Sequence, residues 1–135
     1  MARRYGAGEG YLNGYLETKM VRIFVPTSPG ELLDRITILE IKVKDQPQLQ
    51  EDLTSLQKVA EKILNEDDLY FKLKSVNRQL WNVENIIRQR MLIGDDGLVA
   101  DAARSIVTLN DKRSSIKQEI NKLYGSEFQD EKFYS

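Results

Sequence analysis

The sequence predicts a mainly all-α protein, either an antiparallel helical bundle or a long helical hairpin, with one short strand near its N-terminus. Two observations support this prediction. Apolar residues recur at alternating spacings of three and four through most of residues 47–123, which is the period of a helix that buries one face. Helix start and stop signals divide this part of the chain into separate helices.

The first predicted helix begins at a capping box. Ser28 is its N-cap, Pro29 is its first residue, and Glu31 completes the S-x-x-E pattern, so we expect a helix that extends to about residue 44. Further helices are expected over about 47–64, 67–92 and 98–123. The last two are joined by a short turn at residues 94–97, which makes them antiparallel neighbours with coiled-coil-like spacing.

The N-terminal part differs in composition from the rest. Residues 1–19 are rich in Gly and Tyr and are interpreted as a flexible arm, whereas residues 20–135 form one helical domain. The repeated Gly-Tyr-Leu triplets place Tyr11 and Tyr15 as possible anchors if this arm orders on a partner. Residues 20–25 are β-branched and aromatic, so they predict a strand that ends before Pro26.

Composition excludes several classes of function. The chain contains no Cys and no His, which removes thiol nucleophiles, thiolate zinc sites and histidine general bases. Its net charge is −1 with both signs interspersed, which argues against a nucleic-acid-binding surface. No apolar run approaches the roughly 20 residues of a membrane span. We therefore expect a cytoplasmic protein that uses no metal and no cofactor.

Polar residues fall within or beside the apolar faces of three predicted helices. Folding the chain at the turn places Asn110 level with Trp81, and Arg113 one turn from Asn77. The predicted cluster comprises Glu40, Asn77, Trp81, Glu84, Asn110 and Arg113. We expect Arg113 to contact Glu40 or Glu84. The cluster either fixes the packing register or forms a pocket whose surplus negative charge holds a cation or a basic ligand.

Two isoleucines of the first helix suggest an interface. Ile38 and Ile41 point away from its predicted core face, so either the strand or a second subunit covers them. A two-fold axis that pairs the strand with its copy would bury both isoleucines and produce a homodimer. The strand residues expected at this interface are Val21, Ile23 and Val25.

Residues 28–42, SPGELLDRITILEIK, resemble a block found in an uncharacterised family of small helical proteins from bacteria and phages. Three further elements are similar to that family: Leu80-Trp81 followed by Glu84, Asn110-Asp111-x-Arg113, and Glu131-Lys132-x-Tyr134. The resemblance covers about residues 20–135. It implies a helical fold and supplies no activity.

The leading functional prediction is a non-catalytic interaction or accessory protein that associates with itself or with a protein partner. The alternative is a small helical enzyme or ligand-binding protein that acts on a phosphorylated metabolite or nucleotide through the polar cluster. The Glu31-x-x-Asp34 pair has the spacing of Mg²⁺ ligands in helical pyrophosphatases. Both residues, however, are expected to point away from the core, and no second pair stands on an interior face.

Overall fold

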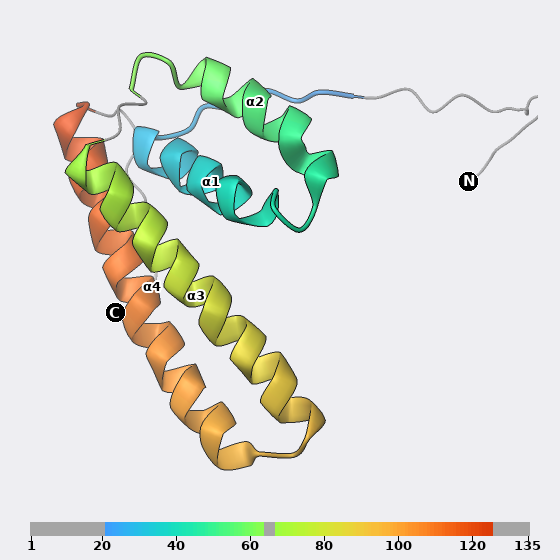
Figure 1. Cartoon of the computed structure of the whole chain (residues 1–135). Helices are drawn as coiled ribbons and strands as arrows, with labels where there is room; N and C mark the ends of the chain where they lie inside the picture. The colour runs from blue at the N-terminus through green and yellow to red at the C-terminus, as the bar shows by residue number, and fades with distance from the viewer. Residues whose placement is uncertain (1–20, 64–66, 126–135) are drawn as a thin grey trace, which may run out of the picture.

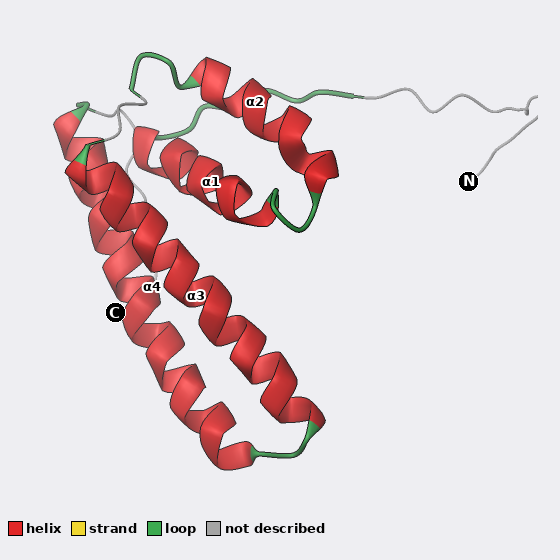
Figure 2. Cartoon of the chain, in the orientation of Figure 1, coloured by secondary structure: helices red, strands yellow, loops and turns green. Residues whose placement is uncertain are grey.

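Four α-helices dominate the computed structural model, which describes residues 21–63 and 67–125 (Figures 1 and 2). They are α1 (Pro29–Lys42), α2 (Gln50–Val59), α3 (Asp68–Leu92) and α4 (Asp96–Leu123), with the short 3₁₀ helix η1 (Pro47–Leu49) directly before α2. The expected mainly helical class is therefore confirmed.

The long helices α3 and α4 form an antiparallel hairpin (Figure 1). Each begins at an aspartate cap: Asp67 accepts a hydrogen bond from the Tyr70 backbone N–H at 3.0 Å, and Asp95 accepts one from the Leu98 N–H at 3.2 Å. Gly94 has φ +72°, which L-residues rarely adopt, and it supplies the turn. Because Asp95 is the cap, α4 begins two residues earlier than predicted.

Helix α1 begins as its sequence predicts. The Ser28 hydroxyl accepts a hydrogen bond from the Glu31 backbone N–H at 3.1 Å, and Pro29 is the first helical residue. The helix ends at Lys42, close to the expected boundary.

The segment predicted as one helix over 47–64 is shorter and divided in the structure. Pro47 begins the 3₁₀ turn η1, and α2 ends at Val59. Beyond it, Ala60 leaves helical geometry, is fully buried and joins the core. Packing of this turn therefore overrides the helical spacing of the sequence.

The helices α1 and α2 lie on one side of the hairpin, over the half that contains the start of α3 and the end of α4 (Figure 1). Helix α1 contacts α2, α3 and α4. The core between them consists of Leu33, Ile36, Leu53, Ala60, Leu73, Val76, Leu80, Ile116 and Ile120. The other half of the hairpin extends beyond α1.

The predicted strand does not form: residues 21–25, its described part, have no regular secondary structure. A strand requires backbone hydrogen bonds from a partner, and the described residues contain no second strand to supply them. The side chains of Val21, Ile23, Phe24 and Val25 are 71% to 84% exposed. In Figure 1 this segment runs past α2 and away from the helices.

Candidate functional site

A buried carboxylate on α1 connects three helices. The Asp34 side chain is only 1% exposed. Its Oδ1 accepts hydrogen bonds from Asn77 Nδ2 on α3 at 3.0 Å and from Arg113 Nε on α4 at 2.8 Å, and its Oδ2 accepts one from Arg113 Nη2. A two-pronged arginine–carboxylate pair is both strong and directional. Asp34 therefore fixes α1 against both helices of the hairpin.

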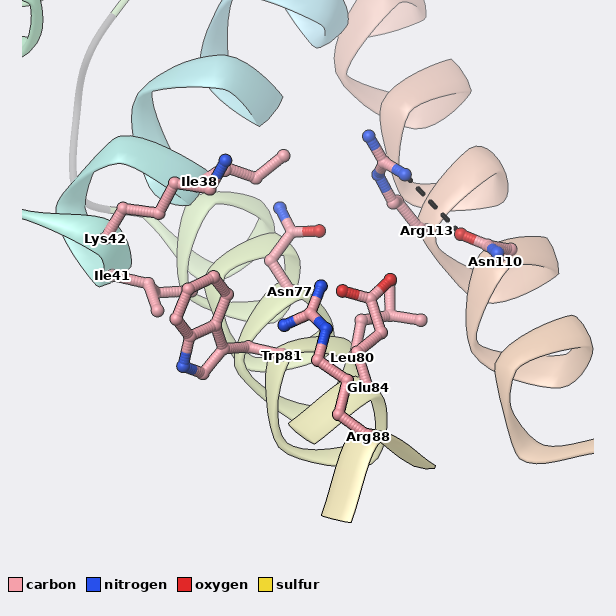
Figure 3. Close-up of a pocket in the computed structure, with 10 residues that line it drawn as sticks. All are labelled: Ile38, Ile41, Lys42, Asn77, Leu80, Trp81, Glu84, Arg88, Asn110 and Arg113. Carbon is pink, nitrogen blue, oxygen red and sulfur yellow. Dashed lines mark hydrogen bonds between the residues drawn. The ribbon is translucent and has the colours of Figure 1, made fainter. Parts of the chain in front are cut away.

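Arg113 remains a cation in this setting. Its hydrogen bond to Asp34 raises the pKa of Arg113 above its ordinary value, while partial burial opposes the shift and nearby carboxylates add to it. Its Nη1 also donates to Asn110 Oδ1 at 3.4 Å, a long bond (Figure 3). Among the described residues, this leaves one N–H on Nη1 and one on Nη2 without a protein acceptor.

The amide of Asn77 has a fixed orientation. Its Nδ2 donates to Asp34 Oδ1 at 3.0 Å and to Thr37 Oγ1 at 2.8 Å. The Thr37 hydroxyl already donates its proton to the Asp34 carbonyl oxygen, so both partners of the amide can only accept. The –NH₂ group must therefore face α1, and Oδ1 points away from α1 (Figure 3). No donor to this oxygen lies within the described part of the chain, although Asn77 is only 4% exposed.

A second ion pair flanks the network. Lys117 Nζ on α4 lies 2.7 Å from Glu31 Oε1 and 4.0 Å from Asp34 Oδ2. One turn further along α4, the Asn121 side chain accepts a hydrogen bond from the Gly30 backbone N–H at 2.7 Å. The start of α1 thus lies directly against α4.

A groove of about 240 Å³ opens beside the network (Figure 3). It is lined by Ile38, Ile41 and Lys42 from α1, by Asn77, Leu80, Trp81, Glu84 and Arg88 from α3, and by Asn110 and Arg113 from α4. Isoleucine, leucine and tryptophan provide an apolar wall, and the amides and charged groups surround it. The arrangement suits a small ligand with both apolar and charged parts.

Five of the six predicted cluster residues line this groove: Asn77, Trp81, Glu84, Asn110 and Arg113. The expected contact between Arg113 and Glu40 or Glu84 is wrong, because its ion-pair partner is Asp34. Glu40 forms no ion pair with Arg113. Its carboxylate instead accepts from the Tyr70 hydroxyl at 2.5 and 2.6 Å and lies 3.3 Å from Lys74 Nζ.

Asp34 is the site residue whose orientation the apolar pattern of α1 predicted wrongly. Asp34 and Glu31 were expected to point away from the core, but α1 is covered by α2, α3 and α4 and has no single core face. One feature of the sequence indicates the position of Asp34. Thr37 is three residues further along α1, so the two polar side chains lie on the same face of the helix. An arginine at a core position of α4 needs such a carboxylate partner.

The interface residues predicted on α1 differ in their surroundings. Ile41 lies outside the core cluster and lines the groove, but it is only 7% exposed, so groups of its own chain already cover most of its side chain. Ile38 is half-buried and lines the groove. Val21, Ile23 and Val25 are exposed, whereas Tyr11 and Tyr15 lie outside the described residues.

Within the described ranges, no three acidic side chains come together as metal ligands would, and no helix is long and apolar enough to cross a membrane. No curated protein and no solved structure matches the chain. A family model does match, over residues 23–135, and this range contains the Asp34 network and the whole groove. The chain therefore belongs to the family of unknown function DUF6165.

Proposed function

We propose that the protein is a non-catalytic interaction protein that forms a homodimer through residues 21–25. The observation that carries this proposal is the exposure of the large apolar side chains in this segment, 71% to 84% for Val21, Ile23, Phe24 and Val25. Burying one such side chain fully is worth about 1.5–3 kcal/mol. A partner that covers the segment is therefore strongly favoured.

A second copy of the same segment is a suitable partner. Antiparallel pairing about a two-fold axis at Ile23 places Val21 opposite Val25 of the other copy, so that one face of the pair is entirely β-branched. Arg22 then lies opposite Phe24 on the other face. The pairing also supplies backbone hydrogen bonds, which residues 21–25 do not make within the described parts of the chain.

The oligomeric state tests this proposal. Light scattering on the purified protein at micromolar concentration should give twice the chain mass of 15.6 kDa. Ile23→Lys should reduce it to the monomer mass, because it places like charges opposite each other at the axis. Val107→Lys is the matched control, since Val107 is also exposed, at 63%, but lies on α4.

A monomer mass for the unmodified protein contradicts the homodimer. Dissociation by Val107→Lys but not by Ile23→Lys would instead place the interface on the hairpin. We further propose that Tyr11 and Tyr15 add aromatic anchors to the same interface, so replacing both with Ser should weaken the dimer.

A second candidate function is the binding of a small ligand in the groove between α1, α3 and α4. The observation that favours it is that five residues of the predicted polar cluster line this one groove. The predicted ligand is a phosphorylated metabolite or a nucleotide. Its binding can be tested by adding such compounds to the protein and measuring the fluorescence of Trp81. A saturable change with any small-molecule class supports this candidate.

A further inference from the structure

We infer that the groove binds a small zwitterion of the α-amino-acid type, with its ammonium group held by Glu84 and Asn77 and its carboxylate held by Arg113. This inference names the ligand class for the second candidate function and rests on it. It is independent of the homodimer. Four features of the groove support it: an amide oxygen, a carboxylate, a fixed guanidinium and an apolar wall.

The first feature is the Oδ1 atom of Asn77. This oxygen belongs to a residue that is only 4% exposed, lines the groove and accepts no hydrogen bond from the described residues. Asp34 and Thr37 hold the –NH₂ group of the same amide, so Asn77 cannot rotate to present a donor instead. A buried acceptor without a donor is unfavourable, and a ligand that presents an N–H group would satisfy it.

The second feature is the Glu84 carboxylate. Glu84 is seven residues, or about two turns, beyond Asn77, so both lie on the same face of α3. In Figure 3 the Glu84 carboxylate and the Asn77 oxygen point toward the same space. Among the described residues, Glu84 has no hydrogen bond and no ion pair with a protein group. An ammonium group has three donors and can bond to both oxygens.

The third feature is the guanidinium of Arg113. Its double hydrogen bond to Asp34 fixes its orientation, and each Nη nitrogen keeps one N–H for a ligand. A ligand carboxylate matches these donors. Lys42 and Arg88 add positive charge at the edge of the groove.

The charge balance of the groove lining disfavours a simple cation. Arg113 and Asp34 neutralise each other, which leaves Lys42 and Arg88 against Glu84. The surplus negative charge expected for a cation site is therefore absent from the groove lining. A plain anion would leave the Asn77 oxygen without a donor and Glu84 without a cationic partner in the ligand, whereas a zwitterion satisfies both kinds of group.

The fourth feature is the size and the wall of the groove. A volume of about 240 Å³ suits a molecule of amino-acid size rather than a larger cofactor. Leu80, Ile38 and Trp81 form an apolar wall beside the charged groups. A ligand side chain such as that of leucine would pack against this wall.

Trp81 is the only tryptophan in the chain, so its fluorescence reports on this groove alone. The probes are L-leucine, N-acetyl-L-leucine, L-leucinamide and inorganic phosphate. N-acetyl-L-leucine lacks the ammonium group, and L-leucinamide lacks the carboxylate. We expect a saturable change with L-leucine, and at least about tenfold weaker binding of the two blocked forms, because each loses a charge-assisted contact.

Two variants locate the binding groups. Glu84→Gln should weaken L-leucine binding about tenfold with little change in the urea midpoint of unfolding, because the exposed Glu84 makes no hydrogen bond and no ion pair among the described residues. Arg90→Gln is the control, since Arg90 is exposed, lies on the same helix and does not line the groove. It should bind L-leucine as the unmodified protein does.

Four results would overturn the inference. Equal binding of L-leucine and N-acetyl-L-leucine removes the ammonium site, and equal affinity of Glu84→Gln removes its assigned partner. Saturation by phosphate, with no response to L-leucine, rejects the zwitterion but leaves a ligand-binding groove. A Trp81 signal that responds to no probe at millimolar concentration rejects the inference, while the light-scattering result for the homodimer stands separately.

Discussion

At the scale of single residues, the fold depends on how it keeps Asp34 out of water. A carboxylate with 1% exposure is costly unless its charge and lone pairs are satisfied. Arg113 supplies the opposite charge and two hydrogen bonds, and Asn77 supplies a third. Because buried ion pairs add little net stability compared with apolar packing, we attribute to this network the fixing of where α1 lies on the hairpin.

Replacing Asp34 with Asn tests that assignment. The substitution keeps the shape but leaves the Arg113 cation without its counter-charge and places an –NH₂ group among donors. Breaking a buried pair costs about 3–5 kcal/mol, and we expect about 3 because Arg113 keeps 29% of its surface in water. Urea denaturation measures the loss. Glu31→Gln breaks a more exposed pair and should cost less than about 1 kcal/mol. Equal effects of the two variants would contradict a special role for Asp34.

Gly30 offers a second test at the scale of a residue. A Cβ at this position would lie 2.5 Å from the Lys117 backbone oxygen and 2.9 Å from Asn121 Oδ1, and the backbone oxygen cannot move aside easily. Gly30→Ala should therefore destabilise the protein by about 1–3 kcal/mol, although Ala is the better helix former.

Gly97 provides the matched control for Gly30. It also lies in the first turn of a helix, but the nearest atom to an added Cβ there is 4.0 Å away. Gly97→Ala should stabilise the protein by about 0.5–1 kcal/mol in the same thermal or urea unfolding experiment. If both substitutions stabilise the protein, α1 does not lie as close to α4 as the structure places it.

At the scale of elements, the two halves of the hairpin differ in how much of their surface other helices cover. The half beneath α1 shares the core, whereas within residues 21–63 and 67–125 no third helix covers the other half. Its large apolar side chains remain exposed: Ile86 at 44%, Met91 at 64%, Leu92 at 87%, Ile93 at 67% and Leu98 at 44%. Few buried apolar contacts give low local stability.

Hydrogen exchange should reveal this difference. We expect the amides of residues 84–107 to be at least about tenfold less protected than those of residues 70–80 and 114–121, since local opening there exposes little buried surface. Mass spectrometry of peptides from exchanged protein measures both regions in one sample. Equal protection along the hairpin would mean that it opens as one unit, or that another molecule covers its end.

The element boundaries also show what local sequence determines. Ser28, Asp67 and Gly125 mark helix ends that could be read from the sequence, because capping depends on a few neighbouring residues. The end of α2 could not, because burial of Ala60 in the tertiary core decides it. The predicted strand failed for a similar reason: strand propensity describes a residue, but pairing requires a partner elsewhere.

At the scale of the whole molecule, the hairpin and its register could be predicted, and the position of α1 could not. Alternating apolar spacing and a short turn place Asn77 near Arg113, and the structure joins both to one carboxylate. Which carboxylate is used depends on the direction from which α1 crosses the hairpin. Neither the period of α1 nor its caps contain that information, so Asp34 was missed and Glu40 was wrongly placed in the cluster.

The pKa shift of Arg113 leads to a prediction for the stability of the whole protein in alkali. Its folded-state pKa is raised, chiefly by the hydrogen bond to Asp34. A raised pKa contributes stability that is complete below the unfolded pKa and is lost only as the pH rises through the folded value. For arginine this loss begins only above about pH 12. The contribution of Arg113 should therefore be constant from neutral pH to about pH 10.

The comparison of the unmodified protein with Arg113→Met measures this contribution. The difference in their free energies of unfolding, from urea titrations at about pH 7 and about pH 10, should agree within error because arginine is fully charged at both. Any other group that titrates in this range affects both proteins and cancels in the difference, provided that it does not interact with Arg113. A difference that shrinks by pH 10 would assign the stabilisation to a coupled group that loses its proton there. A constant difference is the result expected of an arginine that keeps its charge, and with it the ion pair to Asp34, across this range.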